Sequence, residues 1–237
     1  MLFKLLRNYT LVLTVAALAS VTGGILAACS DPTARQPDAG QNPGMQETAR
    51  SGGHDGHGEM HHGGMDHSAM DLGPADAEYD LRFIDAMIPH HEGAIAMAQE
   101  AQEKSQRPEI QQLSQEIIAA QEQEIAQLRQ WRQTWYPDAD ETPIAYNPEM
   151  GHSMPMTEEQ RQSMMMSMDL GPADAEFDRR FMQAMIPHHE GAVVMAQDAL
   201  AKTQRPEIRQ LSQEIIAAQE QEIAQMQQWK QQWYASN

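Results

Sequence analysis

Residues 87–97 read Met-Ile-Pro-His-His-Glu-Gly-Ala-Ile-Ala-Met, and residues 185–195 read Met-Ile-Pro-His-His-Glu-Gly-Ala-Val-Val-Met. In a helix that advances about 100° per residue, imidazole and thioether side chains of the first segment fall on one face about 120° wide. The residues on that face are Asp80, Phe83, Met87, His90, His91 and Met97. Glu92 falls outside it and is expected to point toward water.

Each segment lies inside a longer repeat. Met70-Asp-Leu-Gly-Pro-Ala-Asp-Ala-Glu78 recurs 98 residues later as Met168-Asp-Leu-Gly-Pro-Ala-Asp-Ala-Glu176. The match extends to Tyr136 and Tyr234 at roughly three-quarters identity, far above chance for one chain. The sequence therefore contains two copies of one unit, which we assign to residues 71–136 and 168–237.

Each copy is predicted to form a helical hairpin. From about Ala75 to Lys104, apolar residues and His90 recur at steps of three and four, which is typical of an amphipathic helix. A second helix is predicted from Pro108 to about Trp135, because proline suits the first helical position. One hairpin cannot bury both apolar stripes alone. We therefore predict an all-α fold, a ferritin-like four-helix bundle built from the two hairpins with approximate two-fold symmetry. The alternative is that each hairpin pairs with another chain.

Pro89 lies inside the predicted first helix and allows two interpretations. Its ring crowds the carbonyl of Asp85, which costs about 3 kcal/mol in a regular helix and favours a kink just before the histidines. The alternative is a helix boundary, with His90 and His91 in the first turn of a new helix.

The N-terminal residues resemble a bacterial lipoprotein signal. Lys4 and Arg7 precede an apolar run, and Leu26-Ala-Ala-Cys29 ends on the only cysteine. We expect residues 1–28 to be removed and Cys29 to carry the lipid that tethers the chain to a membrane. The expected location is extracytoplasmic, in the periplasm or cell envelope. The alternative is an uncleaved signal anchor, because the apolar stretch is just long enough to span a bilayer.

Two further segments combine histidine with methionine. Residues 29–70 lack branched apolar side chains and are predicted to be a flexible, disordered arm, with five histidines and three methionines among residues 54–70. The arm histidines are His54, His57, His61, His62 and His67. Residues 137–167 are predicted to be an irregular, proline-rich linker that carries Met150, His152 and Met154. A solubilising spacer is the alternative role for the arm.

Composition excludes two classes of protein. The chain has 16 Lys and Arg against 34 Asp and Glu, a formal charge of −18, so it lacks the basic surface that nucleic acid requires. The chain is also not a disulfide-stabilised scaffold, because its single cysteine cannot form a disulfide within the chain.

The mixture of donors favours copper. Thioether sulfur selects Cu(I), while imidazole binds Cu(I), Cu(II) and Zn(II). Zinc is a poorer match because methionine is not among its usual ligands. A di-iron bundle needs Glu and Glu-x-x-His on inward faces, which neither helix offers. The alternative is structural, with the histidines bonded to a carboxylate such as Asp80 and the methionines filling the core.

The motif Asp80-x-x-Phe83-x-x-x-Met87-Ile-Pro-His90-His91-x-Gly-Ala-x-x-Met97-Ala98, present in both copies, resembles the signature of a bacterial domain-of-unknown-function family with a ferritin-like fold, the CopM-like copper-binding proteins. The resemblance implies copper binding and metal tolerance. The residues that it implicates are Met87, His90, His91 and Met97 in the first copy, and Met185, His188, His189 and Met195 in the second.

The leading functional prediction is a lipid-anchored extracytoplasmic protein that sequesters, buffers or passes on copper, as Cu(I) and also as Cu(II). The expected partners are metal ions and the membrane; a protein that exchanges copper with it is a further class whose identity the sequence leaves open. We expect no enzymatic activity. The alternatives are a copper-dependent oxidase and a helical interaction module without a metal role.

Overall fold

The computed structural model describes residues 70–235. The predicted signal peptide, Cys29 and the five arm histidines lie outside the described residues. The elements, in chain order, are α1 (Tyr79–Lys104), α2 (Pro108–Trp135), β1 (Ile144–Asn147), β2 (His152–Pro155), α3 (Glu158–Met165), α4 (Phe177–Lys202) and α5 (Pro206–Tyr234). No helix in this part of the chain has both the length and the apolar character needed to cross a bilayer.

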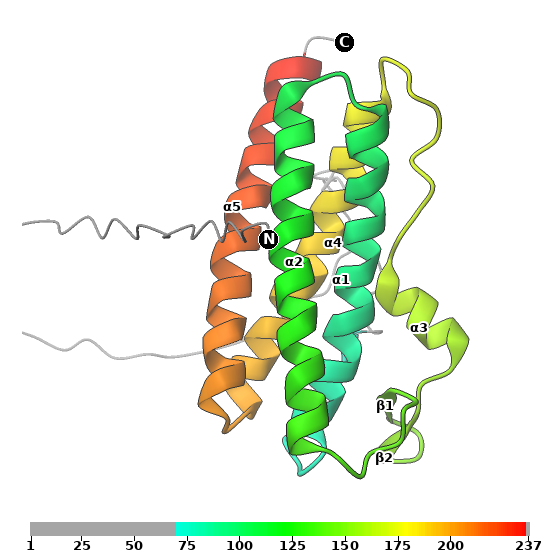
Figure 1. The fold of residues 1–237 in the computed structure, drawn as a ribbon, viewed down its shortest axis with the longest axis vertical. Helices are drawn as coiled ribbons and strands as arrows, with labels where there is room; N and C mark the ends of the chain where they lie inside the picture. Colours follow the sequence, from blue (N-terminus) through cyan, green and yellow to red (C-terminus); the bar gives the residue numbers. More distant parts are fainter. Residues whose placement is uncertain (1–69, 236–237) are drawn as a thin grey trace, which may run out of the picture. The chain divides into compact units, whose positions relative to one another are not determined.

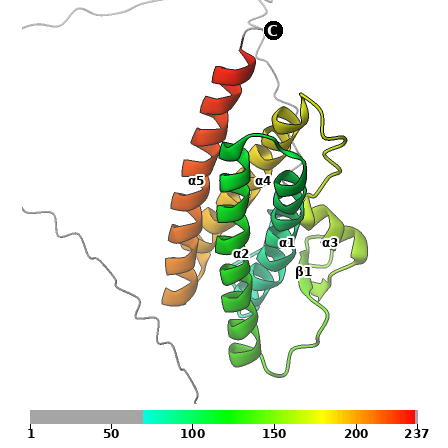
Figure 2. The ribbon, with the colours of Figure 1, turned by 45° about the horizontal axis from the view of Figure 1, so that its top comes forward.

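The long helices form one intramolecular bundle (Figures 1 and 2). Helices α1 and α2 pack as one hairpin, α4 and α5 pack as the other, and α1 packs directly on α4. The predicted all-α four-helix bundle is confirmed, and the alternative of hairpins that associate only with other chains is wrong. Helix α1 also runs through Pro89 without a break, so the interpretation of Pro89 as a helix boundary is wrong.

Helix α1 begins later than the pattern predicts, at Tyr79 rather than near Ala75. Gly73 adopts a left-handed φ of +77°, which turns the chain sharply before the helix. The carboxylate of Asp76 then accepts a hydrogen bond from the Glu78 amide at 3.0 Å. This local turn competes with helix and delays its start.

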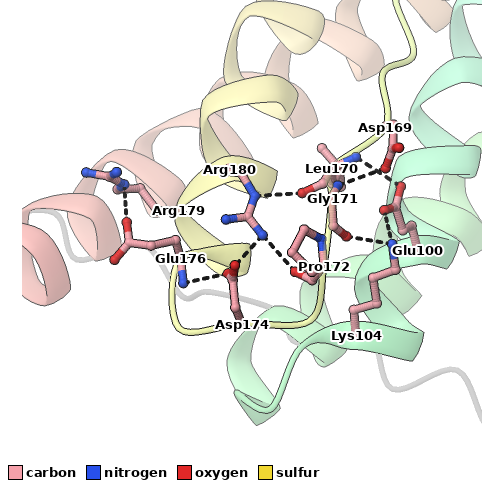
Figure 3. A network of polar contacts seen from close by, with 10 residues as sticks. All are labelled: Glu100, Lys104, Asp169, Leu170, Gly171, Pro172, Asp174, Glu176, Arg179 and Arg180. Atoms are coloured by element: carbon pink, nitrogen blue, oxygen red, sulfur yellow. Dashed lines mark hydrogen bonds and ion pairs between the residues drawn. The ribbon is translucent and has the colours of Figure 1, made fainter.

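Each repeat holds the N-terminal turn of the other. The Lys104 ammonium of repeat 1 donates to the Gly171 carbonyl of repeat 2 at 2.7 Å, and the Lys202 ammonium donates to the Gly73 carbonyl at 2.7 Å. Figure 3 shows the first of these contacts, where Arg180 also donates to the Leu170 carbonyl at 2.6 Å. The paired contacts support the approximate two-fold symmetry expected from the duplication.

The same symmetry relates two arginine–tryptophan contacts at the helix ends. The guanidinium of Arg107 lies 4.2 Å from the ring centroid of Trp233, and that of Arg205 lies 4.2 Å from the ring centroid of Trp135. Both arginines therefore cross from one repeat to the other and stack on an aromatic face.

The linker is more ordered than the sequence predicts. Strands β1 and β2 pair antiparallel, from Ile144 opposite Pro155 to Asn147 opposite His152. Helix α3 starts at a capping box, in which the Thr157 hydroxyl accepts from the Gln160 amide and the Gln160 side chain accepts from the Thr157 amide. The prolines predicted an irregular segment, whereas the Thr157-x-x-Gln160 pattern marks the start of a helix.

The linker packs mainly on repeat 1, since its hairpin and α3 both contact α1. Asp85 of α1 is 1% exposed and binds Arg132 Nε at 2.6 Å. The same carboxylate accepts a hydrogen bond from the Ile144 amide of β1 at 2.8 Å. Asp85 thus joins helix α2 and the linker to α1.

Candidate metal centre

The four histidines of the two motifs are buried at the centre of the bundle. His90, His91 and His189 are 0% exposed and His188 is 1% exposed. The ring centroids of His90 in α1 and His188 in α4 are 3.9 Å apart. The two predicted sites therefore meet between the repeats, because α1 packs on α4.

His91 and His189 each face a carboxylate. His91 Nε2 lies 2.7 Å from Glu124 Oε2, and His189 Nε2 lies 2.6 Å from Glu222 Oε2. A carboxylate only accepts, so the nitrogen facing it carries a hydrogen. Carboxylate–histidine pairs of this kind orient metal-binding imidazoles in other proteins.

His90 and His188 have different surroundings. The Nε2 of His188 lies 3.0 Å from the main-chain carbonyl oxygen of Met165, which assigns the hydrogen to Nε2 and leaves Nδ1 as an acceptor. Neither ring nitrogen of His90 has a hydrogen-bond partner among residues 70–235. A buried polar group without a partner costs about 1–3 kcal/mol of stability, so His90 would destabilise the core if its role were purely structural.

Burial keeps the central pair neutral. It lowers the pKa of His188 to about 3, with a further lowering from the nearby His189. It also lowers the pKa of His90 well below its ordinary value, and the neighbouring His188 adds to that effect. A neutral imidazole retains the lone pair that a metal ion requires.

The glycines of the two motifs allow close packing over these rings. A Cβ on Gly93 would overlap the carbonyl oxygen of Met165, so only glycine lets the linker backbone cross α1 here. A Cβ on Gly191 would stand 3.1 Å from His90 Nε2, 3.3 Å from Met70 Cε and 3.5 Å from Met166 Sδ. Two methionines from outside the motifs therefore reach the histidine centre.

The motif methionines are buried in the apolar core. Met87 and Met195 belong to one buried apolar cluster, which also contains Phe83, and Met97 and Met185 belong to a second, which also contains Phe181. All four are at most 1% exposed. Such burial is typical of core packing, and their role as copper ligands stays a prediction.

The predicted linker ligands lie on the surface, away from the buried rings. Met150 is 60% exposed and Met154 is 39% exposed. His152 is also exposed, and its Nδ1 lies 3.1 Å from the Met150 carbonyl oxygen. They form an outer group on the hairpin, separate from the bundle site.

The side chains around His90 suit a soft metal ion. Within residues 70–235, no group of three or more His, Cys, Asp or Glu side chains has a metal-binding arrangement. The atoms available here as metal ligands are the unpartnered ring nitrogens of His90, the free Nδ1 of His188 and the thioether sulfur beside Gly191. A set of imidazole and thioether fits Cu(I) better than Zn(II) or a hard cation.

Sequence reasoning missed several of these residues. It named Asp80 as a carboxylate for the histidines, but Asp80 pairs with Arg205 at 3.3 Å. Glu124 was detectable as a charged residue within the apolar stripe of α2, and it recurs as Glu222. Glu92, by contrast, lies partly exposed and pairs with Arg129 at 2.7 Å, as its predicted outward position requires.

The fold and the site define a duplicated four-helix bundle with a buried histidine cluster between its repeats. The chain belongs to the DUF305 family, described as a domain of unknown function, whose model matches residues 25–132 and 80–230.

Solved structures of CopM share this fold. The Cu(II)-bound form is 41% identical with a TM-score of 0.52, and covers 65% of this chain and 97% of that chain. The Cu(I)-bound form is 37% identical with a TM-score of 0.51, at 65% and 97% coverage. An Ag-bound form obtained by soaking is 37% identical with a TM-score of 0.52, at the same coverage.

One curated relative matches a shorter segment. It is the uncharacterized protein L153 of Acanthamoeba polyphaga mimivirus, which is 39% identical over 49 residues. The match covers 21% of this chain and 32% of that protein, so the chain spans about a third of that relative's length.

Proposed function

We propose that this protein binds copper at the histidine centre between its two repeats, and that it sequesters, buffers or passes on the ion. The observation that carries the proposal is His90, which is fully buried, has no hydrogen-bond partner among the described residues and lies against His188. The similarity to CopM in its Cu(I)-, Cu(II)- and Ag-bound forms supports copper and silver as the relevant ions.

Copper would be held through nitrogen lone pairs that the fold already presents. His90 and His188 supply neutral imidazoles, while Glu124 and Glu222 fix the orientation of His91 and His189. Burial limits the access of water, so an ion held here is protected from exchange with solvent ligands. These features support storage and transfer of copper.

We propose a binding role rather than catalysis. The carboxylates nearest to the histidines, Glu124 and Glu222, face His91 and His189 and are thereby engaged in orienting them. A copper-dependent oxidase is the alternative, and it predicts oxygen consumption in the presence of Cu(I). Steady-state oxygen uptake with excess Cu(I) measures this directly, and we expect none above the rate of the metal alone.

The proposed location is outside the cytoplasm, on a lipid anchor. This part rests on the sequence Leu26-Ala-Ala-Cys29. Replacing Cys29 with Ser should release the protein from the membrane fraction or block its processing. Unchanged attachment and mass would favour the signal anchor.

The test of copper binding replaces the four buried histidines. Changing His90, His91, His188 and His189 to Gln keeps polarity but removes the imidazole ligands, so the tightest Cu(I) class should disappear with helix content nearly intact. Binding is measured anaerobically against a competing Cu(I) chelator, with circular dichroism on the same samples. An unchanged isotherm would refute the bundle site.

A matched variant tests the motif methionines. Changing Met87, Met97, Met185 and Met195 to Leu keeps apolar volume and usually costs less than about 1.5 kcal/mol per site. Because these side chains pack in the apolar clusters, loss of Cu(I) affinity in this variant would show that their sulfurs also contribute. Unchanged affinity would assign them to the core.

A further inference from the structure

Three consecutive methionines end α3, and each has a different environment. Met164 is 5% exposed and belongs to the same apolar cluster as Met87. The sulfur of Met165 accepts a contact from Arg161 Nη1 at 3.3 Å. The sulfur of Met166 instead lies beside Gly191, within 3.5 Å of the position of its missing Cβ.

Met166 has an unusual backbone conformation. It caps α3 with a φ of +47° and is the only residue other than glycine with a positive φ among residues 70–235. Helices commonly end in this left-handed conformation, but the position usually holds glycine because a side chain is disfavoured there. A methionine in such a conformation is an outlier that invites a functional explanation.

The Met166 sulfur and an unpartnered nitrogen of His90 lie beside the same glycine, Gly191. His90 Nε2 lies 3.1 Å from the Gly191 Cβ position, so His90 Nε2 and Met166 Sδ face the same point. His90 is fully buried, whereas Met166 is only partly buried.

We propose that Met166 is a copper ligand of the His90–His188 centre and that its thioether makes this centre selective for soft monovalent ions, Cu(I) and Ag(I). The inference rests on the proposed function and assigns a ligand from the linker, outside both repeats. Thioether sulfur favours Cu(I), whereas imidazole alone also accepts Cu(II) and Zn(II).

The linker side of the centre is therefore asymmetric. The Met165 carbonyl accepts a hydrogen bond from His188, and the sulfur of the next residue, Met166, lies beside Gly191, where His90 Nε2 also lies. One segment thus reaches the space around both histidines. Met70 also approaches Gly191, but the atom that faces it is the terminal methyl at 3.3 Å, so we assign Met70 to packing.

The experiment compares Met166→Leu with Met165→Leu in the full chain. Leu keeps apolar volume in both variants, but only Met166→Leu removes a sulfur that faces the centre. We expect Met166→Leu to weaken Cu(I) binding by about tenfold or more and to leave Zn(II) binding nearly unchanged, because a soft ligand is lost. Met165→Leu should match the wild type.

A second readout observes the sulfur itself. In protein labelled with ¹³C at the methionine methyls, adding one equivalent of Ag(I) should shift the Met166 resonance, identified by its absence in Met166→Leu. Two outcomes would overturn the inference: a Met166 resonance that does not respond while the histidine resonances do, or equal Cu(I) affinity in the two variants. A wild-type protein that binds neither ion would instead overturn the proposed function itself.

Discussion

Asp85 in repeat 1 and Gln183 in repeat 2 occupy equivalent positions in two nearly identical sequences, yet their surroundings differ. Asp85 is 1% exposed beneath the linker, whereas Gln183 is exposed on α4. The same contrast separates Met70, 3% exposed, from its counterpart Met168, 45% exposed. The linker therefore covers repeat 1 at these positions and leaves the equivalent positions of repeat 2 open.

This difference shows how a duplicated fold acquires a single asymmetric centre. Symmetry brings His90 and His188 together, each from an equivalent position. The linker then breaks the symmetry, because the Met165 carbonyl accepts a hydrogen bond from His188, whereas neither ring nitrogen of His90 has a partner among the described residues. The Met166 sulfur lies beside Gly191. The repeats supply the imidazoles, and the connection between them supplies the thioether.

The largest expected effect comes from making repeat 1 resemble repeat 2. Asp85→Gln removes the buried partner of Arg132 and of the Ile144 amide, and should lower the free energy of unfolding by about 3 kcal/mol. Gln183→Ala, its matched control on the open face, should change it by less than about 0.5 kcal/mol. Urea denaturation measures both. Equal effects would show that the linker does not depend on Asp85.

The central pair predicts a dependence of stability on pH. The pKa of His188 is lowered from 6.5 to about 3. Below pH 6.5 this residue therefore binds a proton in the unfolded chain but stays neutral in the folded protein. The free energy of unfolding is therefore highest above pH 6.5, where His188 is neutral in both states, and it falls as the pH falls toward 3. Between pH 6.5 and 5, apo protein should lose about 1.6 kcal/mol from this residue. His188→Gln should flatten that slope in urea titrations; an equally steep slope in the variant would contradict the assignment.

The two motif glycines should respond differently to alanine. Gly93→Ala would push a Cβ into the Met165 carbonyl and displace the linker, at a cost of about 1–2 kcal/mol after the gain in helix propensity. Gly191→Ala meets the ends of side chains that can move, so its stability should change by less than about 1 kcal/mol. Thermal melts of the two variants show which substitution lowers the melting temperature more. A reversed order would mean that the linker backbone is not held against α1.

The smallest effect is expected from the methionines that open each repeat. Met70→Leu alters a buried side chain and should cost less than about 1.5 kcal/mol, while Met168→Leu alters an exposed one and should change stability by less than about 0.5 kcal/mol. Differential scanning calorimetry resolves the two. A larger effect at Met168 would contradict the described exposure.

Much of the bundle was predictable because its pattern repeats. The stripe around His90 predicted α1 and its burial, and the duplication predicted a bundle built from two equivalent hairpins. The helix from Pro108 to Trp135 was predicted with correct limits, since Pro108 is a strong start signal.

The remainder depended on contacts distant in sequence. Nothing local marks Met166 as different from Met164 or Met165; its direction follows from the end of α3 and from the space above Gly191. The motif methionines were predicted as ligands from their spacing beside histidine, and that role stays a prediction. Spacing alone does not separate a thioether that packs in an apolar cluster from one that faces an imidazole.

The most direct test asks whether the repeats share one copper centre. The five arm histidines, His54 to His67, are first changed to Gln, and His90→Gln and His188→Gln are then made singly in that background. If His90 and His188 bind one ion together, either single change should abolish the tight Cu(I) class in an anaerobic competition titration. If each variant instead keeps half of the tight sites and only the double variant loses all of them, the repeats bind copper separately and the shared centre is refuted.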